Sequence, residues 1–281
     1  MSPLSDVSQT ALLTLRARAS ETRRDDPLIQ DPEAVRLLES LINRLPADTG
    51  ERIMRGRLPG SFTSYIALRA RRYDEYVRRF REEYPEGLVV SLGAGFDTRY
   101  YRVSGKPWKY IEVDLPSVVK LKKQALGSGE EYRLIAGSVL EENWMGEIRA
   151  IQREEVLFLA EGLFMYLPGA GVRRVFERLA DSFSNSEIVF EAVHAKYTRG
   201  WRKKALESKM RRRFGSEAGS AYLFGLRSAK EIEAFAPGIR VLEEWSWFED
   251  DDIRPAIFKL FRGLKSVTRT QWTIRAVLGA D

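Results

Sequence analysis

The chain of 281 residues is predicted to form an α/β fold of the doubly wound type, with a mostly parallel sheet of about seven strands. After residue 85, short apolar runs alternate with segments of helical periodicity, the order typical of crossover units in a parallel sheet. The first run, LVVSLG, leads directly into a glycine turn, as the first strand of such a sheet does. We expect strands at 88–93, 109–115, 132–137, 155–164, 187–193, 239–247 and 271–278.

The last two runs alternate apolar and polar residues more than the earlier ones, which is typical of strands that pair antiparallel at a sheet edge. Between the runs, PSVVKLKKQAL and GVRRVFERLADSF have the periodicity of amphipathic helices. Helices are therefore expected on both faces of the sheet.

Residues 1–86 are predicted to form a helical cap ahead of the sheet. In SYIALRARRYDEYVRRFREEY, apolar residues recur every three or four positions, at Ile66, Ala70, Tyr73, Val77, Phe80 and Tyr84. The arginines at 71, 72, 78, 79 and 81 fall on other faces, and a solvated face is the simplest interpretation of them. Because the chain has no linker or low-complexity tract, we expect one domain over 1–281, with an acceptor lid at 196–236.

Composition excludes several kinds of site. The 46 lysines and arginines against 40 aspartates and glutamates give a formal net charge of +6, which is compatible with an acidic partner. The absence of cysteine excludes disulfides, thiolate metal sites and cysteine nucleophiles. His194 is the only histidine, so no histidine-rich metal site is expected. No stretch reaches the roughly 18 apolar residues of a membrane span, and we expect a cytoplasmic protein without membrane contact.

The glycine turn predicts a nucleotide cofactor. LVVSLG runs into Gly93-Ala94-Gly95-Phe96-Asp97-Thr98, and glycines there let the backbone approach a ligand without an intervening β-carbon. Asp114 ends the second predicted strand, where its carboxylate can accept hydrogen bonds from both ribose hydroxyls. The alternative role for Asp114 is to cap the helix that Pro116 begins, and the two roles are compatible.

The turn does not favour a dinucleotide. A pyrophosphate site has a third glycine where this chain has Thr98, because the helix N-terminus must come close to the phosphates. S-adenosylmethionine contains adenosine but no phosphate, and its amine and carboxylate require an acidic group and a cation. The sequence offers both near the turn. S-adenosyl-L-methionine is therefore the cofactor we expect.

Three segments, VVSLGAGFDTRYYRV, YIEVDLPSVVKLK and FLAEGLFMYL, resemble the leucine carboxyl methyltransferase family, including its bacterial tetracenomycin-type polyketide O-methyltransferases. The resemblance also covers RASETRRDDPLIQDPEA and the segment ALRARRYD, and it spans roughly positions 10 to 170. It implies a Rossmann-like class I methyltransferase fold with a helical N-terminal extension and a helical lid. The activity that it implies is S-adenosylmethionine-dependent O-methylation of a polyketide-like molecule in secondary metabolism.

The resemblance also implies the cofactor contacts. Arg69 would hold the methionine carboxylate, with Arg18 as a basic helper, and Glu161 would face the methionine amine. An ionised carboxylate in the apolar run FLAEGLF is costly without a partner, which favours a functional role for Glu161. Gly93 and Gly95 would pass under the methionine and ribose, and Asp114 would bind the ribose hydroxyls. Where the family has Asp-Leu at the adenine, this chain has Ser138-Val139, and Ser138 can accept one hydrogen bond without supplying a charge.

The acceptor is expected to be a small molecule with a hydroxyl or a carboxylate. A carboxylate is already ionised at neutral pH, whereas a hydroxyl must lose its proton to a base within hydrogen-bond reach. His194, just past the fifth strand, is the only histidine for that task, although an ordinary histidine at a strand end is an equally good interpretation. Tyr166 is a second candidate for contact with the acceptor, and packing is its alternative role.

The predicted lid at 196–236 is basic and aromatic, which suits a planar acidic acceptor such as an aromatic polyketide acid. It contains Arg199, Arg202, Lys203, Lys204, Lys209, Arg211, Arg212 and Arg213, with Trp201, Phe214, Tyr222 and Phe224 between them. Clustered arginines and aromatics are also typical of nucleic-acid surfaces, so an RNA- or DNA-directed methyltransferase is the alternative, although no RNA-binding module is visible. A cofactor-binding protein without catalysis is a third possibility. The oligomeric state is not predicted.

Overall fold

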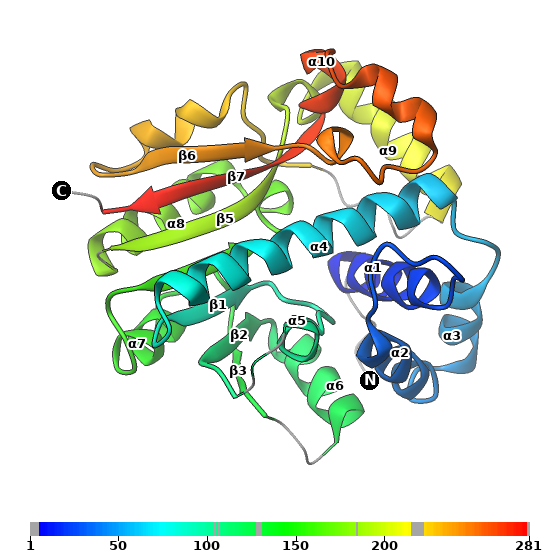
Figure 1. Ribbon diagram of the computed structural model, residues 1–281, viewed down its shortest axis with the longest axis horizontal. Coiled ribbons are helices and arrows are strands. Elements are labelled where there is room, and N and C mark those ends of the chain that lie inside the picture. The colour runs from blue at the N-terminus through cyan, green and yellow to red at the C-terminus, as the bar shows by residue number, and fades with distance from the viewer. Residues whose placement is uncertain are drawn as a thin grey trace.

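The computed structural model describes residues 6–279 except 104, 106, 128–130, 184 and 215–221. Its sheet has the strand order β3-β2-β1-β4-β5-β7-β6 (Figure 1). Strands β1 to β5 are parallel, and β7 pairs antiparallel with β5 and with β6. The predicted doubly wound fold is therefore confirmed, with the two alternating runs at the antiparallel edge. The strands are β1 (Leu88–Leu92), β2 (Tyr110–Asp114), β3 (Arg133–Ala136), β4 (Val156–Ala160), β5 (Ser186–Val193), β6 (Arg240–Trp245) and β7 (Gln271–Leu278).

The strand β4 differs most from its predicted range, and the difference positions a candidate site residue. The run 155–164 was expected to be extended throughout, but β4 ends at Ala160. Gly162 has a φ of +66°, so the chain turns after Glu161, and Phe164–Tyr166 then form the 3-10 helix η1. Glu161 therefore lies at the carboxyl end of β4, where ligands bind in open α/β sheets.

Helices cover both faces of the sheet. In Figure 1 the long helix α4 crosses one face, while α7 and α8 lie behind the sheet. The helices α1, α2 and α3 lie beside the N-terminal end of α4 (Figure 1), and α1 packs against α4. The α-helices are α1 (Asp6–Thr22), α2 (Pro32–Ile42), α3 (Ala47–Met54), α4 (Gly60–Glu83), α5 (Arg99–Arg102), α6 (Pro116–Leu126), α7 (Asn143–Arg149), α8 (Gly169–Ser182), α9 (Gly200–Phe214) and α10 (Lys265–Thr268). The remaining 3-10 helices are η2 (Ala195–Tyr197), η3 (Ala229–Ala234), η4 (Trp247–Glu249) and η5 (Ala256–Phe261).

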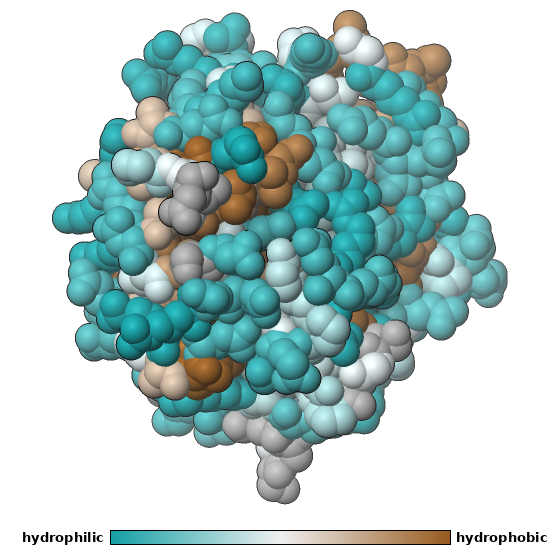
Figure 2. All heavy atoms as spheres, turned by 60° about the vertical axis from the view of Figure 1, so that its left-hand side comes forward, coloured by the Kyte–Doolittle hydropathy of each residue, from teal (hydrophilic) through white to brown (hydrophobic). Residues whose placement is uncertain are grey.

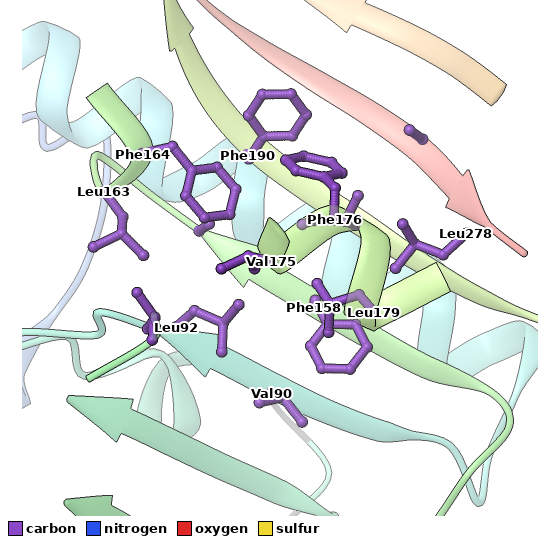
Figure 3. Close-up of a cluster of buried hydrophobic side chains, with 14 of the residues drawn as sticks. Val90, Leu92, Phe158, Leu163, Phe164, Val175, Phe176, Leu179, Phe190 and Leu278 are labelled. Atoms are coloured by element: carbon purple, nitrogen blue, oxygen red, sulfur yellow. The ribbon is translucent and has the colours of Figure 1, made fainter. Parts of the chain in front are cut away.

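Each strand divides its side chains between two hydrophobic cores. In β1, Val90 and Leu92 belong to the core under α7 and α8, and Val89 belongs to the core under α4. This follows from the period of two in a strand, where successive side chains point to opposite faces. Figure 3 shows Val175, Phe176 and Leu179 of α8 packed toward the strand residues. The buried stripe of α4, which includes Tyr73, Val77 and Phe80, closes the opposite core.

The arginines of α4 are more than a solvated face. Arg71 lies 2.8 Å from both Asp250 and Asp252, in the segment that follows β6. Arg72 and Arg79 both bind Glu243 of β6. The solvated-face interpretation holds for Arg78 and Arg79, which are exposed, although Arg79 also pairs with Glu243. It does not hold for Arg71 and Arg72, which are partly buried. Their ion pairs tie α4 to the edge of the sheet.

The surface is mainly hydrophilic on the face shown in Figure 2, with several separate hydrophobic areas. Charged residues make up 31% of the chain, which accounts for this character. Within the described ranges, no helix combines the length and apolar composition needed to cross a lipid bilayer.

Candidate active site

A cavity of about 360 Å³ lies where β1, β2, β4 and β5 end, beside the N-terminal helix α1. All eight residues predicted to bind the cofactor line it, and so does Tyr166. Those eight come from α1, α4, the turn after β1, the end of β2, the segment after β3 and the end of β4. They are Arg18, Arg69, Gly93, Gly95, Asp114, Ser138, Val139 and Glu161. The fold thus brings together residues that lie more than 140 positions apart in the sequence.

The glycine turn is required by backbone geometry as well as by space for a ligand. Gly93 and Gly95 have φ values of +60° and +55°, a region that side chains disfavour. A β-carbon on Gly93 would lie 2.6 Å from Leu163, and one on Gly95 would lie 2.9 Å from Ala11. Glycine is therefore needed at these two positions for a second reason besides space for the ligand, because a β-carbon would also collide with the protein itself.

Asp114 points toward the turn. Its carboxylate accepts hydrogen bonds from the backbone N–H of Gly95 at 2.6 Å and from that of Leu115 at 2.7 Å. Burial raises its pKa above the ordinary value for aspartate, and these two hydrogen bonds oppose the shift. Asp114 does not cap the following helix, whose N-cap is Leu115 without a side-chain hydrogen bond. Because a carboxylate has about four acceptor positions, it can still accept bonds from ribose hydroxyls.

The segment after β3 forms the wall beside Asp114. The backbone N–H of Gly137 donates to the Asp114 carbonyl at 2.9 Å, which fixes this segment against the end of β2. The Ser138 hydroxyl oxygen accepts from the Leu140 N–H at 3.3 Å, and Val139 is buried. The wall is therefore polar at one position and apolar at the next, and it carries no charge.

Arg69 lies between two carboxylates, Glu161 just after β4 and Glu191 of β5. Its Nε contacts Glu161 at 2.8 Å, and its Nη1 contacts Glu191 at 2.8 Å and the Tyr65 hydroxyl at 3.0 Å. Glu161 also accepts from Arg99 at 2.6 Å. Burial raises the pKa of Glu161, but the charges of Arg69 and Arg99 outweigh it and hold the pKa below its ordinary value. Both Glu161 and Arg69 are therefore charged and fixed in orientation.

A buried network of ion pairs contacts the glycine turn through Phe96 and Asp97. Arg99 pairs with Asp74 at 2.8 Å and also with Asp97, and Arg102 pairs with Asp74, Asp97 and Asp31. Arg18 belongs to the same network, since its Nε contacts Asp31 at 3.0 Å and its Nη2 donates to the Phe96 carbonyl at 2.7 Å. The predicted helper Arg18 thus braces the turn while it lines the cavity.

Part of the cavity is lined by η1, which supplies Tyr166, the one aromatic side chain among the described lining residues. Tyr166 of η1 lies there with Met165, Leu167 and Gln271. Its ring centroid is 5.7 Å from that of the buried Tyr222, and burial raises the pKa of Tyr166 to about 12. Tyr166 is therefore a neutral hydrogen-bonding group at neutral pH. This part of the cavity has the apolar walls and few polar groups typical of a small-molecule site.

His194 is not among the residues that line the cavity. It is the N-cap of η2, and its Nδ1 accepts a hydrogen bond from the backbone N–H of Lys196 at 3.1 Å. Burial and the nearby charge of Lys196 lower its pKa. The structure therefore gives His194 a local structural contact and separates it from the predicted cofactor residues.

The described basic side chains of the segment predicted to form a lid, 196–236, also lie outside the cavity lining. Arg199, Arg202 and Lys204 are exposed, and Lys203 is partly exposed. The side chains of 209–221, with Lys209, Arg211, Arg212, Arg213 and Phe214, lie outside the described residues.

Glu191 is a cavity residue that sequence reasoning did not single out. The signal that marked Glu161, an acidic residue inside an apolar run, is also present in EIVFEAV and would have identified it. Asp97 could have been found as a polar residue of the turn itself. Gln271, the first residue of the last strand, has no sequence signal of this kind.

Comparisons with known proteins identify the family. The leucine carboxyl methyltransferase family matches residues 11–180, more than half of the chain. The tetracenomycin polyketide synthesis O-methyltransferase TcmP of Streptomyces glaucescens is 28% identical over 97% of this chain and 96% of its own length. A putative S-adenosyl-L-methionine-dependent methyltransferase of Saccharopolyspora erythraea is 32% identical over 68% of this chain and 69% of its own.

Solved structures agree on the fold. A putative methyltransferase from Thermobifida fusca has a TM-score of 0.54 at 15% identity, covering 94% of both chains. An S-adenosylmethionine-dependent methyltransferase from Anabaena variabilis has a TM-score of 0.53 at 13% identity, covering 86% of this chain and 93% of that one. The predicted family and its cofactor, S-adenosylmethionine, are both confirmed. The chain belongs to the leucine carboxyl methyltransferase family of S-adenosylmethionine-dependent methyltransferases.

Proposed function

We propose that the chain transfers the methyl group of S-adenosylmethionine to an oxygen atom of a small, planar, polyketide-like molecule. One observation carries the proposal: a cavity of about 360 Å³ is lined by every predicted cofactor residue and, where η1 forms its wall, by Met165 and Tyr166. Similarity to TcmP along nearly the whole chain supports oxygen as the methylated atom and a polyketide as the acceptor class.

The residues present fit this cofactor. Asp114 would bind the ribose hydroxyls, Gly137 to Val139 would contact the adenine, and Glu161 would face the methionine amine. Arg69 would bind the methionine carboxylate through Nη2, which has no hydrogen-bond partner among the described residues. When bound, the cofactor supplies a methyl group on a sulfonium, which an acceptor oxygen attacks in line with the bond that breaks. The chain contributes mainly by positioning the two reactants.

The acceptor would bind where η1 lines the cavity, beside Met165 and Tyr166. Tyr166 and Met165 would pack against a planar ring system, and the Tyr166 hydroxyl would remain a neutral hydrogen-bonding group because its pKa is about 12.

Calorimetry with S-adenosylmethionine and with its demethylated product tests the proposal. We expect both to bind and to raise the unfolding temperature, because each binds the native state only. NAD serves as the control and should not bind. Retention on heparin with a steep salt dependence of RNA binding, in the absence of small-molecule turnover, would instead support a nucleic-acid acceptor.

A further inference from the structure

A short segment, 222–226, fixes the part of the cavity wall that η1 forms, and we call it the strap. The backbone N–H of Leu223 donates to the Met165 carbonyl at 2.8 Å, which ties the strap to η1. At its other end, the backbone N–H of Leu226 donates to the Val193 carbonyl at 2.9 Å, where β5 ends. The strap therefore connects the cavity wall to the sheet.

The strap approaches β5 so closely that position 225 requires glycine. A β-carbon built on Gly225 would lie 2.7 Å from the Val193 carbonyl oxygen and 2.9 Å from Cγ2 of Thr198. Close-packed interiors leave little free space for backbone shifts. The strap is therefore held in one position, and the side chains that it carries are held with it.

Tyr222 is the strap residue that packs against η1. Its ring centroid lies 5.7 Å from that of Tyr166, and Tyr222 is buried, with 9% of its surface exposed. Both rings belong to a cluster with the buried Met165 and Val193, and Leu206 of α9 packs against the same cluster. Tyr166 lines the cavity, whereas Tyr222 does not. Tyr222 therefore supports the Tyr166 ring from outside the cavity lining.

The two tyrosine rings act through their shape rather than through charge. Burial raises the pKa of Tyr166 to about 12 and raises the pKa of Tyr222 well above its ordinary value. Both tyrosines are therefore neutral at neutral pH. A neutral ring in the wall restrains the ring system of an acceptor in the same way whether the methylated oxygen belongs to a hydroxyl or to a carboxylate.

The position of Tyr166 limits how far an acceptor can extend. The proposed function places the acceptor beside Met165 and Tyr166, with its reacting oxygen turned toward the cofactor. Its ring system then extends along η1 and meets the Tyr166 ring. A side chain in a close-packed region moves only where there is free space behind it, and Tyr222 fills that space. A longer ring system would therefore require Tyr166 to move, and Tyr222 prevents that movement.

We propose that Tyr222 is a positioning residue that sets the length of the planar acceptor, because it holds the Tyr166 ring in place. The inference rests on the methyltransferase function proposed above. Truncation of Tyr222 would leave free space into which the Tyr166 ring turns. Larger ring systems would then fit, and small ones would lose their contact with the ring.

The first experiment measures acceptor binding by calorimetry to the protein loaded with S-adenosylhomocysteine. The acceptors have one to four fused aromatic rings, and each carries both a hydroxyl and a carboxylate, so that the result does not depend on which group is methylated. Tyr222→Ala should raise the ratio of association constants, four rings to one ring, about tenfold or more, since one methylene group in an apolar pocket contributes about 10- to 200-fold. Tyr222→Phe keeps the ring and should keep the wild-type ratio.

Two further variants complete the series. Tyr222→Leu fills part of the space, so it reports a smaller shift in the same direction where the alanine variant does not fold. Phe235→Ala is the matched control, because the Phe235 ring is partly buried and lies 6.4 Å from that of Phe224 in the strap. It removes an aromatic contact of the same strap but leaves both tyrosines in place, so the ratio should not change. All four variants should bind S-adenosylmethionine within a few-fold of wild type, because neither Tyr222 nor Phe235 lines the cavity.

The second experiment measures methyl transfer to the same acceptors. The ratio of kcat/KM for the four-ring and one-ring acceptors should change in the same order across the variants, and mass spectrometry of the products identifies the methylated group. A purely structural role for Tyr222 would instead lower kcat/KM for all acceptors by a similar factor.

The possible results separate this inference from the proposed function. If S-adenosylmethionine does not bind the wild type, the proposed function fails. If it binds but no acceptor of the series binds or reacts, the planar acceptor class is wrong and the inference is overturned with it. If acceptors bind and both Tyr222→Ala and Tyr222→Leu keep the ratio within about twofold of wild type, or if Phe235→Ala shifts it equally, Tyr222 does not set the acceptor length.

Discussion

The ion pair between Lys122 of α6 and Glu112 of β2 allows a quantitative test of how the glycine turn is held. Both side chains are fully buried, and Lys122 Nζ lies 2.6 Å from Glu112 Oε2 and 2.6 Å from the Asp97 carbonyl oxygen. Lys122→Met keeps a similar apolar length but removes the charge and both hydrogen bonds. Loss of one partner of a buried pair costs about 3–5 kcal/mol. We expect the loss to approach this value in urea unfolding at pH 9, which lies above the pKa of about 7 that Glu112 has in the wild type.

The cost should depend on pH in a defined direction. Burial raises the pKa of Glu112 to about 7, with Lys122 opposing the shift, so the variant pKa is higher still. Near pH 5 the carboxyl of the variant is protonated, and only the unpaired Asp97 carbonyl remains, which costs about 1–3 kcal/mol. The cost of Lys122→Met must therefore grow as pH rises from 5 to 9.

The double variant Lys122→Met/Glu112→Leu provides the control. It removes both charges, and apolar replacement of a buried pair is often neutral or stabilising, so it should be more stable than Lys122→Met alone. A cost that is independent of pH, or a double variant whose losses simply add, would refute the reasoning.

Three further predictions concern the turn and the core. Asp114→Asn should weaken S-adenosylmethionine binding about 10- to 150-fold in calorimetry, because hydrogen bonds to a charged group contribute about 1.5–3 kcal/mol. An unchanged affinity would show that Asp114 does not contact the ribose. Gly95→Ala should lower the free energy of unfolding in urea by at least about 1 kcal/mol, because φ is +55° and the new β-carbon would lie 2.9 Å from Ala11. An unchanged free energy of unfolding would mean that the turn adjusts without strain. Phe158→Ala, at a fully buried position of β4, should cost about 3–5 kcal/mol by the same method, and a loss below 1 kcal/mol would contradict the packing shown in Figure 3.

The sequence predicts best those features of the structure that depend on residues close to one another in the chain. The seven strands follow from apolar runs whose neighbours alternate between two cores, and the turn after β1 follows from glycines that have positive φ. Asp114 was predictable because its partner, Gly95, lies one crossover earlier in the same unit. Glu161 was predictable because a carboxylate in an apolar run needs a cation, although the run did not indicate which one.

What the sequence could not supply is the choice between similar side chains. Arg69 is one of many arginines on α4, and only the three-dimensional arrangement gives it two carboxylates while Arg71 and Arg72 bind the sheet edge. His194 was the predicted base because the ordinary pKa of histidine lies closest to neutral pH. The apolar run EIVFEAV marks Glu191, but its contact with Arg69 becomes visible only when α4 is packed against β5.

The charges around the cavity explain why this turn suits a sulfonium nucleotide rather than a dinucleotide. Two arginines and four acidic residues line it, and both arginines are already paired with carboxylates. The N–H of Gly95, which a phosphate-binding turn would offer to its ligand, is donated to Asp114, and that of Thr98 is donated to Asp97. A pyrophosphate would therefore meet acidic groups where it needs donors. S-adenosylmethionine has no phosphate and carries a positive charge on sulfur, so the carboxylates that disfavour a pyrophosphate are compatible with this cofactor.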